Sequence, residues 1–362
     1  MTQIAQRVPT LSARATDESE LDGRLREVTD ELRTRAARHH HAFRDLVDHL
    51  AGLVLGGKRL RSRLLLAVWR SLSRGDRQAD AALDVACALE LLHNALLAHD
   101  DVIDNDTVRR GEPNVSGRAA ARAARLGTAR GAADAFGAAS GIIAGDLLLA
   151  TAQRLVATCD VDTTTRRRLV ELLDEAIVDA AAGEHADAWF GLGSEESDAG
   201  RVLRTTELKT ARYSFQAPLV AAAVLAGTDH HTAAALDRIG RGLGVVYQLR
   251  DDVLGVYGDP ELTGKSVHGD LREGKQTLLV SVARTSPGWT QVAHLFGSPT
   301  LTDAGAEELR AVIRDSGALA EVERTVRAEC DAVRRHIEEA GLDADLERLL
   351  LDVLARCAER AA

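Results

Sequence analysis

The stretch 80-DAALDVACALELLHNALLAHDDVID-104 joins a long run of alanine and leucine to an acidic end. It is long enough to form a central buried helix, and residues 138–158 have the same character. Further helical patterns cover 19–54, 163–190, 198–226, 231–257, 274–285, 301–340 and 343–361. Aromatic residues make up only 3% of the chain and there are only six prolines, which argues against an all-β architecture. The sequence therefore predicts an all-α fold.

The organisation of the chain favours one domain. It has 362 residues, of which 45% are hydrophobic, enough for a sizeable core. No composition typical of an interdomain linker interrupts it, so we predict a single helical domain over 19–362, preceded by a mobile tail over 1–18. Between the two central helices, residues 116–137 alternate glycine breaks with arginine. This segment is expected to be a surface insertion with a short helix, either a lid or a plain solvated connection.

Charge and composition exclude several classes of protein. A formal net charge of -10 argues against nucleic acid as the main partner. The longest apolar run, 218-PLVAAAVLAG-227, is about half of what a bilayer requires, so no membrane span is expected. Residues 1–20 lack the apolar core of a secretory signal. The cysteines show no paired metal spacing and are expected to be free thiols in a cytoplasmic protein: Cys87, Cys159, Cys330 and Cys357.

Two aspartate-rich segments lie far apart in the chain, 99-HDDVIDNDTVRRGEPNV-115 and 244-GVVYQLRDDVLGVYGD-259. Asp100 and Asp104 are four residues apart, so on a helix they share a face and can bind one hard cation. Asp251 would approach the same ions from another helix. A single motif of this kind can also be a helix cap or a solvated acidic face. The second acidic pair and the basic segments nearby favour a divalent-metal site for a diphosphate.

The first basic segment is 56-GGKRLRSRLLL-66, in which a glycine pair is expected to open a helix. Lys58 and Arg61, three residues apart, would share a face there and, with the helix amides, favour a doubly charged anion. A basic helix start can also be merely solvated. His93 precedes Asp100 by seven residues and is expected on nearly the same face, as a phosphate donor or as a core histidine.

Further basic groups follow both acidic segments. Arg109 and Arg110 precede Gly111 in an expected turn, where the two side chains can diverge to different anions. Lys209 offers a cation beside the hydroxyl of Thr210. The loop 258-GDPELTGKSVHGDLREGK-275 has the wrong spacing for a P-loop, and we expect a flap that carries Lys265 over the acidic helix.

In order and approximate spacing, these segments resemble the GGKRLR, DDxxD…RRGxP, KT and YQxxDD…TGK…DLxxGKxT motifs of the trans-prenyl diphosphate synthases. The resemblance is to the polyprenyl synthetase family, in particular to bacterial geranylgeranyl diphosphate synthases, and covers roughly residues 20–362. It implies an all-α bundle of the isoprenoid synthase type around a deep central cavity, usually in a homodimer. It also implies isopentenyl diphosphate and an allylic diphosphate as substrates, and three Mg²⁺ ions in each active site.

The roles that the resemblance implies can be stated position by position. The magnesium ligands would be Asp100, Asp104 and Asp251. The clamps on the allylic diphosphate would be Arg109, Lys209 and Lys265. The site for isopentenyl diphosphate would comprise Lys58, Arg61, His93 and Arg110. Supporting groups around the metals and the reacting allyl group would be Asp101, Asp252, Thr210 and Gln248.

Two positions depart from the family pattern. The second motif commonly ends in aspartate, but Gly255 stands at that position. Because this last aspartate usually acts through metal-bound water, weaker or more Mg-dependent binding is expected, and not a dead site. Asn114 stands where threonine or serine is common after RRGxP.

Product length is expected to depend on the helix below the first aspartates. Ala95 lies five residues before Asp100, about 7.5 Å along the axis, where the family uses a bulky aromatic to stop the growing tail early. Ala95 and Ala88 would leave space, while Leu91 and Leu92 would narrow it. These residues favour geranylgeranyl diphosphate over a longer or a farnesyl product. Three rival functions remain: a class I terpene cyclase, which needs no second diphosphate site, an inactive partner subunit of a heteromeric synthase, and a purely structural helical protein.

Overall fold

The computed structural model describes residues 15–73, 75, 77–109, 111–192, 198–258 and 269–359. The predicted all-α fold is confirmed: helices account for nearly every described element. The chain forms two compact units, one with Leu11–Asp174 and Pro218–Thr228 (unit 2) and one with Glu175–Ala217 and Asp229–Ala362 (unit 1). Within the described residues the chain passes between the units inside α7, at the start of α9 and in the short connection between α9 and α10. The single domain over 19–362 stays a prediction. The tail expected over 1–18 lies mostly outside the described residues, and the first helix begins at Ala15.

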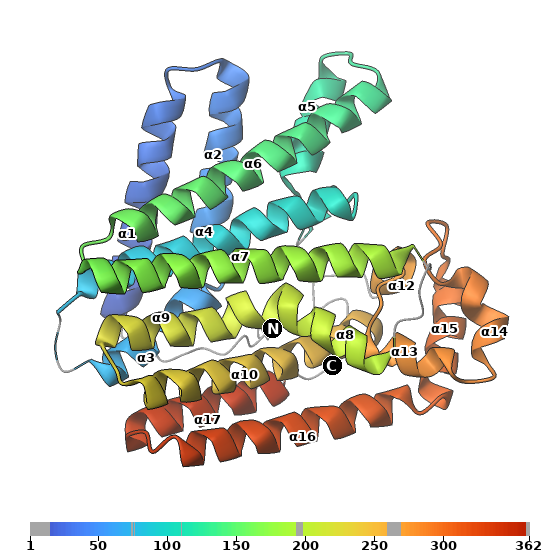
Figure 1. Cartoon of the computed structure of the whole chain (residues 1–362). Coiled ribbons are helices and arrows are strands. Elements are labelled where there is room, and N and C mark those ends of the chain that lie inside the picture. Colours follow the sequence, from blue (N-terminus) through green and yellow to red (C-terminus); the bar gives the residue numbers. More distant parts are fainter. Residues whose placement is uncertain are drawn as a thin grey trace, which may run out of the picture. The chain divides into compact units, whose positions relative to one another are not determined.

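Unit 2 is built around its fourth helix, which is the one that sequence composition marks as buried. Its helices are α1 (Ala15–Ala36), α2 (His41–Leu55), α3 (Leu60–Leu72), α4 (Ala79–Ile103), α5 (Val115–Arg125), α6 (Arg130–Thr158), the first part of α7 (Thr163–Gly191) and most of α9 (Ala217–Ala226). The central helix α4 packs against α1, α2, α3, α5 and α6 (Figure 1). A helix covered on several sides needs apolar residues around its circumference, which explains the run of alanine and leucine.

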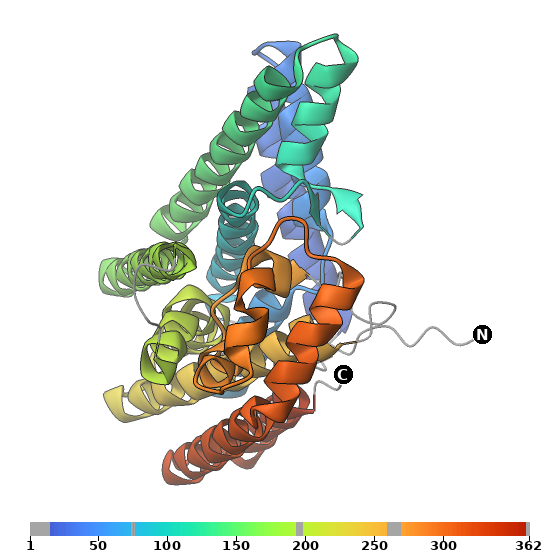
Figure 2. The ribbon, with the colours of Figure 1, turned by 90° about the vertical axis from the view of Figure 1, so that its right-hand side faces the viewer.

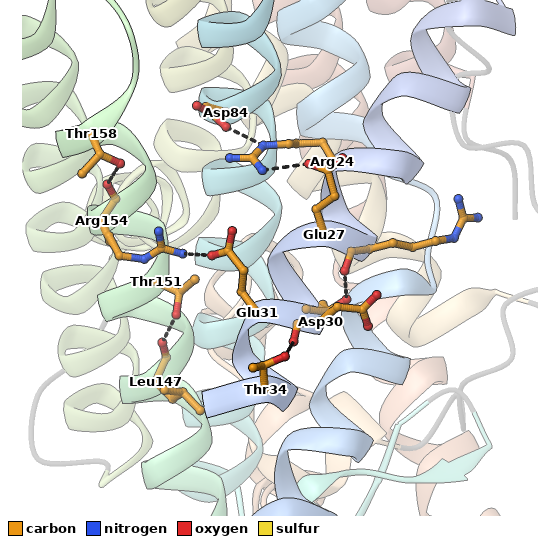
Figure 3. A network of polar contacts seen from close by, with 12 residues as sticks. Arg24, Glu27, Asp30, Glu31, Thr34, Asp84, Leu147, Thr151, Arg154 and Thr158 are labelled. Carbon is orange, nitrogen blue, oxygen red and sulfur yellow. Dashed lines mark hydrogen bonds and ion pairs between the residues drawn. The ribbon is translucent and has the colours of Figure 1, made fainter. Parts of the chain in front are cut away.

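Ion pairs also join α1 to its neighbours within unit 2 (Figure 3). Arg24 Nε donates to Asp84 Oδ1 on α4 at 2.7 Å, and Arg154 Nη2 on α6 donates to Glu31 Oε2 at 3.0 Å. Partly exposed pairs of this kind typically contribute only about 0.2–1 kcal/mol each to stability, so apolar packing dominates the attachment of α1.

Two helices of unit 2 are long and apolar enough, by length and composition alone, to cross a membrane: Ala79–Ile103 and Arg130–Thr158. In α4, 67% of the apolar window is buried inside the protein, which is the behaviour of a core helix. In α6 only 44% is buried. The sequence-based expectation rested on the run at 218–227 and did not consider these helices.

A two-stranded ribbon follows α4, formed by β1 (Val108–Arg109) and β2 (Glu112–Pro113) in antiparallel register. Gly111 has φ +79°, so the predicted turn with positive φ is confirmed. Asn114 then caps α5, because its side chain accepts a hydrogen bond from the Gly117 amide at 2.8 Å. Asparagine, serine and threonine are all good helix caps, so this departure from the family pattern keeps its local function.

The segment 116–137 is helical over most of its length. It forms most of α5 and the first turns of α6, which pack against each other. A side chain in place of Gly137 would meet the carbonyl oxygen of Ser116 at 2.6 Å, so the two helices are in backbone contact there. The short helix expected in this segment is confirmed.

Unit 1 is organised around a long helix that carries the second aspartate pair. Its elements are α8 (Ala199–Thr206), the π-helix η1 (Glu207–Gln216), α10 (His230–Tyr257), α12 (Gly269–Glu273), α13 (Leu278–Arg284), α14 (Trp289–Val292), the 3₁₀ turn η2 (Ala293–Leu295), α15 (Asp303–Asp315), α16 (Ala318–Glu339) and α17 (Ala344–Ala358), with the second part of α7. The long helix α10 packs against η1, α16 and α17. Figure 2 shows α16 and α17 beside each other, in red.

Candidate active site

The first acidic region is the last turn of α4. Asp100 and Asp104 are one turn apart there, as predicted, and the Asp104 amide donates to the Asp100 carbonyl at 2.9 Å as the helix ends. The Asp104 side chain is exposed, whereas Asp101 is buried with 4% of its surface exposed. Adjacent residues on a helix point in different directions, so only part of this motif faces water.

Arg109, on the ribbon after α4, holds this region together. Its Nε donates to Asp101 Oδ1 at 2.7 Å and its Nη2 to Asp100 Oδ2 at 3.0 Å. Burial raises the pKa of Asp101, while the charge of Arg109 and its hydrogen bond oppose that rise. Burial lowers the pKa of Arg109, but Asp101 and Asp100 outweigh it, so the guanidinium stays charged. One guanidinium fork thus fixes two carboxylates.

The second acidic region is the end of α10. Asp252 is buried, with 4% of its surface exposed, while Asp251 is half-buried. Gln248 Nε2 donates to Asp252 Oδ1 at 2.9 Å, and Lys275 Nζ donates to the same oxygen at 3.1 Å. Burial raises the pKa of Asp252, and the charge of Lys275 is the main opposing cause. The role expected of Gln248 around the metals and the allyl group stays a prediction.

Lys275 is a site residue that the sequence reasoning did not assign, although it stands in the quoted DLxxGKxT motif. Its Nζ also lies 3.8 Å from Asp270 Oδ2. Burial lowers the pKa of this lysine, but Asp270, Asp252 and Asp251 outweigh burial and raise the pKa well above its ordinary value. It is therefore a fixed cation beside the second aspartate pair.

Lys209 and Thr210 lie on the π-helix η1. Lys209 Nζ donates to Asp187 Oδ2 at 2.9 Å and lies 3.0 Å from Glu184 Oε2, both on α7. Neither acid was identified from the sequence, because both lie more than twenty residues before Lys209. The predicted clamp is thus bonded to two acids of α7.

Close backbone contacts within unit 1 position η1. A Cβ atom at Gly183 of α7 would lie 2.3 Å from the Lys209 amide nitrogen, and one at Gly244 of α10 would lie 2.4 Å from the Ala211 Cα. Only glycine permits such a close approach, so contacts between backbones fix the position of Lys209. Helices of the π type are rare and often occur at functional sites.

The basic segment before α3 differs from the prediction. The glycine pair forms the turn between α2 and α3, Arg59 is the N-cap with φ 51°, and the helix begins at Leu60. Lys58 therefore lies in the turn and only Arg61 lies on the helix, so the expected shared helical face is wrong. Both residues still flank the N-terminus of α3, where backbone amides favour an anion.

The other predicted residues divide into three groups. His93 is half-buried on α4. The expected chain-length residues are fully buried, each with 0% of its surface exposed: Ala88, Leu91, Leu92 and Ala95. Arg110 and residues 259–268 of the expected flap, with Lys265, lie outside the described residues, whereas the end of that loop forms α12 and carries Lys275.

The donor set suits Mg²⁺, which prefers carboxylate and phosphate oxygen. Within the described ranges, no three acidic, imidazole or thiol groups converge as a ready-made metal site. Magnesium is commonly bound by one or two carboxylates together with substrate phosphates and water. Aspartates presented in pairs, each steadied by a cation, fit that mode of binding.

Comparison with known proteins decides the family. The model of the family described as polyprenyl synthetase matches residues 41–310. The chain belongs to the polyprenyl synthetase family. As a member it is a prenyltransferase that elongates trans-prenyl diphosphates, and the predicted family and class of enzyme are confirmed.

Several polyprenyl synthetase relatives are similar over most of their length. A geranylfarnesyl diphosphate synthase of Aeropyrum pernix is 32% identical over 326 residues, which cover 86% of this chain and 95% of the relative. A geranylgeranyl diphosphate synthase of Mycobacterium tuberculosis is 33% identical over 72% of this chain and 69% of the relative. The crystal structure of a geranylgeranyl pyrophosphate synthase from Corynebacterium glutamicum, complexed with isoprenyl diphosphate and magnesium, matches with a TM-score of 0.89. It is 27% identical and covers 97% of this chain and 100% of that chain.

Proposed function

We propose that this prenyltransferase condenses isopentenyl diphosphate with an allylic diphosphate in a magnesium-dependent reaction, and that its main product is geranylgeranyl diphosphate. The observation that supports this most is the repeated arrangement at the ends of α4 and α10. In each, a buried aspartate is bonded to a fixed cation, and its neighbour is more exposed. Two such acidic regions, together with separate basic segments, suit two diphosphates of which one must leave.

The metal-holding residues in this proposal are Asp100, Asp104 and Asp251, with Asp101 and Asp252 as their supports. When bound, three Mg²⁺ ions would neutralise the allylic diphosphate and make it a better leaving group. Arg109, Lys209 and Lys275 would bind its oxygens as charge develops there.

The second substrate would be bound by a different basic set. Lys58, Arg61 and His93, with Arg110, would hold the diphosphate of isopentenyl diphosphate. Thr210 and Gln248 would lie beside the reacting allyl group, and Lys265 would complete the clamp on the leaving diphosphate. The proton lost after condensation would pass to the departed diphosphate, and an aliphatic lining would exclude the water that quenches the cation.

The geranylgeranyl assignment rests on Ala95. If this fully buried residue faces the growing tail, Ala95→Phe would fill the space with a ring and shift the product from twenty carbons towards fifteen. Overpacking also lowers the stability of the protein by about 1–3 kcal/mol, so total activity can fall. The informative quantity is therefore the ratio of products made by folded protein, measured by chromatography against standards. An unchanged chain-length distribution in an active variant would place the floor elsewhere.

We also propose a cytoplasmic homodimer. Less than half of the apolar window of α6 is buried in the chain, and Phe136, Ile142 and Ile143 on this helix are 45–49% exposed. An apolar surface of this kind is typical of a subunit interface. Light scattering of the wild type and of Ile143→Glu tests it: a dimer that becomes a monomer supports the proposal, and a monomeric wild type contradicts it.

The function is tested by incubating purified protein with Mg²⁺, isopentenyl diphosphate and each allylic primer in turn. Elongated linear prenyl diphosphates, with geranylgeranyl diphosphate predominant, are expected. A cyclised hydrocarbon from the allylic substrate alone would indicate a terpene cyclase, and no turnover of any primer would contradict the proposal.

A further inference from the structure

The turn between α1 and α2 and the turn between α5 and α6 lie at the same end of unit 2 in both views of the ribbon (Figure 1 and Figure 2). Helix α5 packs against α2, and Arg122 near the end of α5 forms an ion pair with Asp45 near the start of α2. This ion pair joins the two turns. Neither turn carries a residue that is assigned to metal or diphosphate binding.

Both turns are basic, in a chain whose formal net charge is -10. The stretches 34-TRAARHHHAFR-44 and 118-RAAARAARLGTAR-130 contain no aspartate and no glutamate. Four exposed arginines at or beside the turns define a surface that we call the basic end: Arg38, Arg44, Arg125 and Arg130. A cluster of positive charge on a protein of negative net charge is a surface for an anionic partner.

The acids that follow or precede the first turn are bonded to cations outside the basic end. Asp45 is paired with Arg122. Arg33 contacts Asp30 at 2.8 Å and Asp48 at 3.1 Å. The charge of the basic end is therefore not cancelled by these neighbours.

The arginines of the basic end differ little in their freedom. Within the described ranges, no carboxylate lies within ion-pair distance of Arg38, Arg44 or Arg125. Arg130 lies 3.8 Å from Asp134, but 96% of its side chain is exposed, so this contact is weak. All four guanidinium groups are thus available to a partner in solution.

An apolar side chain lies at the tip of the basic end. Leu126 follows Arg125 directly and is 80% exposed, the largest value for a large hydrophobic side chain among the described residues. A single exposed leucine is common on protein surfaces. Arginine and leucine presented together at the tip of a helical hairpin, however, match the boundary between lipid headgroups and acyl chains.

We propose that the basic end docks reversibly on a membrane surface that contains anionic phospholipid. Its arginines contact the lipid phosphates, and Leu126 enters the layer between the headgroups. Each arginine near an anionic membrane strengthens binding about fivefold, so four of them give a reversible attachment and not a permanent one. This surface is separate from the apolar face of α6 that we assign to the subunit interface.

Two features favour lipid over nucleic acid as the anionic partner. Leu126 gains nothing from a sugar-phosphate backbone, whereas it is removed from water in a bilayer. A flat membrane touches only one end of the protein, and the Debye length is about 8 Å at physiological ionic strength, so the acids elsewhere in the chain are screened from it. A long nucleic acid strand would meet those acids.

Vesicle sedimentation with the full chain is the first test. Wild type is mixed with vesicles of phosphatidylcholine alone, and with vesicles of equal parts phosphatidylcholine and phosphatidylglycerol. Binding to the anionic vesicles alone is expected, and it should be lost at high salt because the contact is electrostatic. Absent binding, or equal binding to both kinds of vesicle, would overturn the proposal. Normal elongation by a wild type that binds no vesicles would refute the docking and leave the proposed function intact.

The second test asks whether the basic end is the part that binds. Arg38→Gln/Arg125→Gln should weaken binding to the anionic vesicles about 25-fold, from about fivefold for each arginine. The control Arg238→Gln/Arg335→Gln removes two exposed arginines from α10 and α16 and should leave binding unchanged. An equal loss in the two double variants would show a dependence on net charge alone and would contradict the proposal. Circular dichroism and unchanged elongation activity verify the fold of both variants.

The third test separates lipid from other anionic partners. Leu126→Ser should weaken binding to the anionic vesicles about tenfold, because an apolar side chain is no longer transferred out of water. Binding of a short duplex DNA, measured in parallel by fluorescence anisotropy, should be weak and the same in both proteins. Vesicle binding that is unchanged in Leu126→Ser, or wild type that prefers the DNA to the vesicles, would refute membrane docking.

Discussion

At the ends of both α4 and α10 a buried aspartate is paired with a cation, but the cation differs between the two helices. In both, the second aspartate of the pair is 4% exposed and bonded to a cation, and the first is more open to solvent. At α4 the cation is Arg109, whose fork reaches both aspartates from a ribbon a few residues away. At α10 it is Lys275, which contacts Asp252 and the remote Asp270.

The two regions differ in how far apart in the sequence their residues lie. The first region is complete within residues 100–109, so a short peptide motif specifies all of it. The second region depends on the packing of α12 against α10, because its cation, Lys275, comes from later in the chain.

The largest effect is expected from the more exposed acids. Asp100→Ala, Asp104→Ala and Asp251→Ala should each lower turnover about 10²- to 10³-fold, the range for losing a group that stabilises developing charge. Circular dichroism should show unchanged helix content, because no core side chain is cut. Near-normal turnover in Asp100→Ala would remove the metal assignment of the first region.

A smaller effect is expected on stability when a cation is removed. Lys275→Met leaves Asp252 buried and less well paired, which should cost about 1–3 kcal/mol. The raised pKa of Asp252 sets the sign of the pH dependence: its ionised form is the costly one, so the deficit should shrink as pH falls towards that pKa. Lys275 itself stays charged throughout, because its pKa is raised well above the ordinary value.

Urea unfolding at pH 8 and pH 5 measures this difference. Arg109→Met is the matched variant for the first region, where the pKa of Asp101 is also raised by burial. A stability deficit of either variant that is the same at both pH values would contradict the assigned role of its cation.

The basic residues before α3 should affect neither acidic region. Lys58→Ala and Arg61→Ala are expected to raise the KM for isopentenyl diphosphate about tenfold or more, as loss of a charged hydrogen bond would, with little change for the allylic substrate. Steady-state kinetics with each substrate varied in turn shows this. Loss of affinity for the allylic substrate alone would mean that the two diphosphate sites are assigned the wrong way round.

The smallest effect concerns the buried cysteine thiols. Burial raises the pKa of Cys87 to about 12, although Arg24 opposes it. All four cysteines are buried, so a thiol reagent at pH 8 should label native protein slowly and unfolded protein at four positions. Rapid labelling of native protein would show that the α4 core opens easily.

Sequence periodicity predicted the long helices closely, because the burial of a helix face determines the spacing of its apolar residues. The expected helices at 163–190 and 231–257 correspond to α7 at Thr163–Gly191 and α10 at His230–Tyr257. The π-helix at Glu207–Gln216 was not predicted, since its hydrogen-bond pattern leaves no compositional mark. The turn at Lys58 was missed because Arg59 adopts a left-handed conformation that is uncommon for a residue with a side chain.

The site was predictable where chemistry lies within a short motif. Asp100, Asp104 and Arg109 are neighbours in sequence and in space. Contacts between distant segments leave no such signal, so the pairing of Lys209 with Glu184 and Asp187 could not be derived from spacing.

The claim that both acidic regions hold metal through one diphosphate is tested most directly by an equilibrium titration with Mn²⁺, followed by the spin-resonance signal of the free ion. Inorganic pyrophosphate should strengthen Mn²⁺ binding to wild-type protein, and both Asp100→Asn and Asp251→Asn should reduce this strengthening. Binding that is independent of pyrophosphate, or that survives unchanged in either variant, would contradict the account.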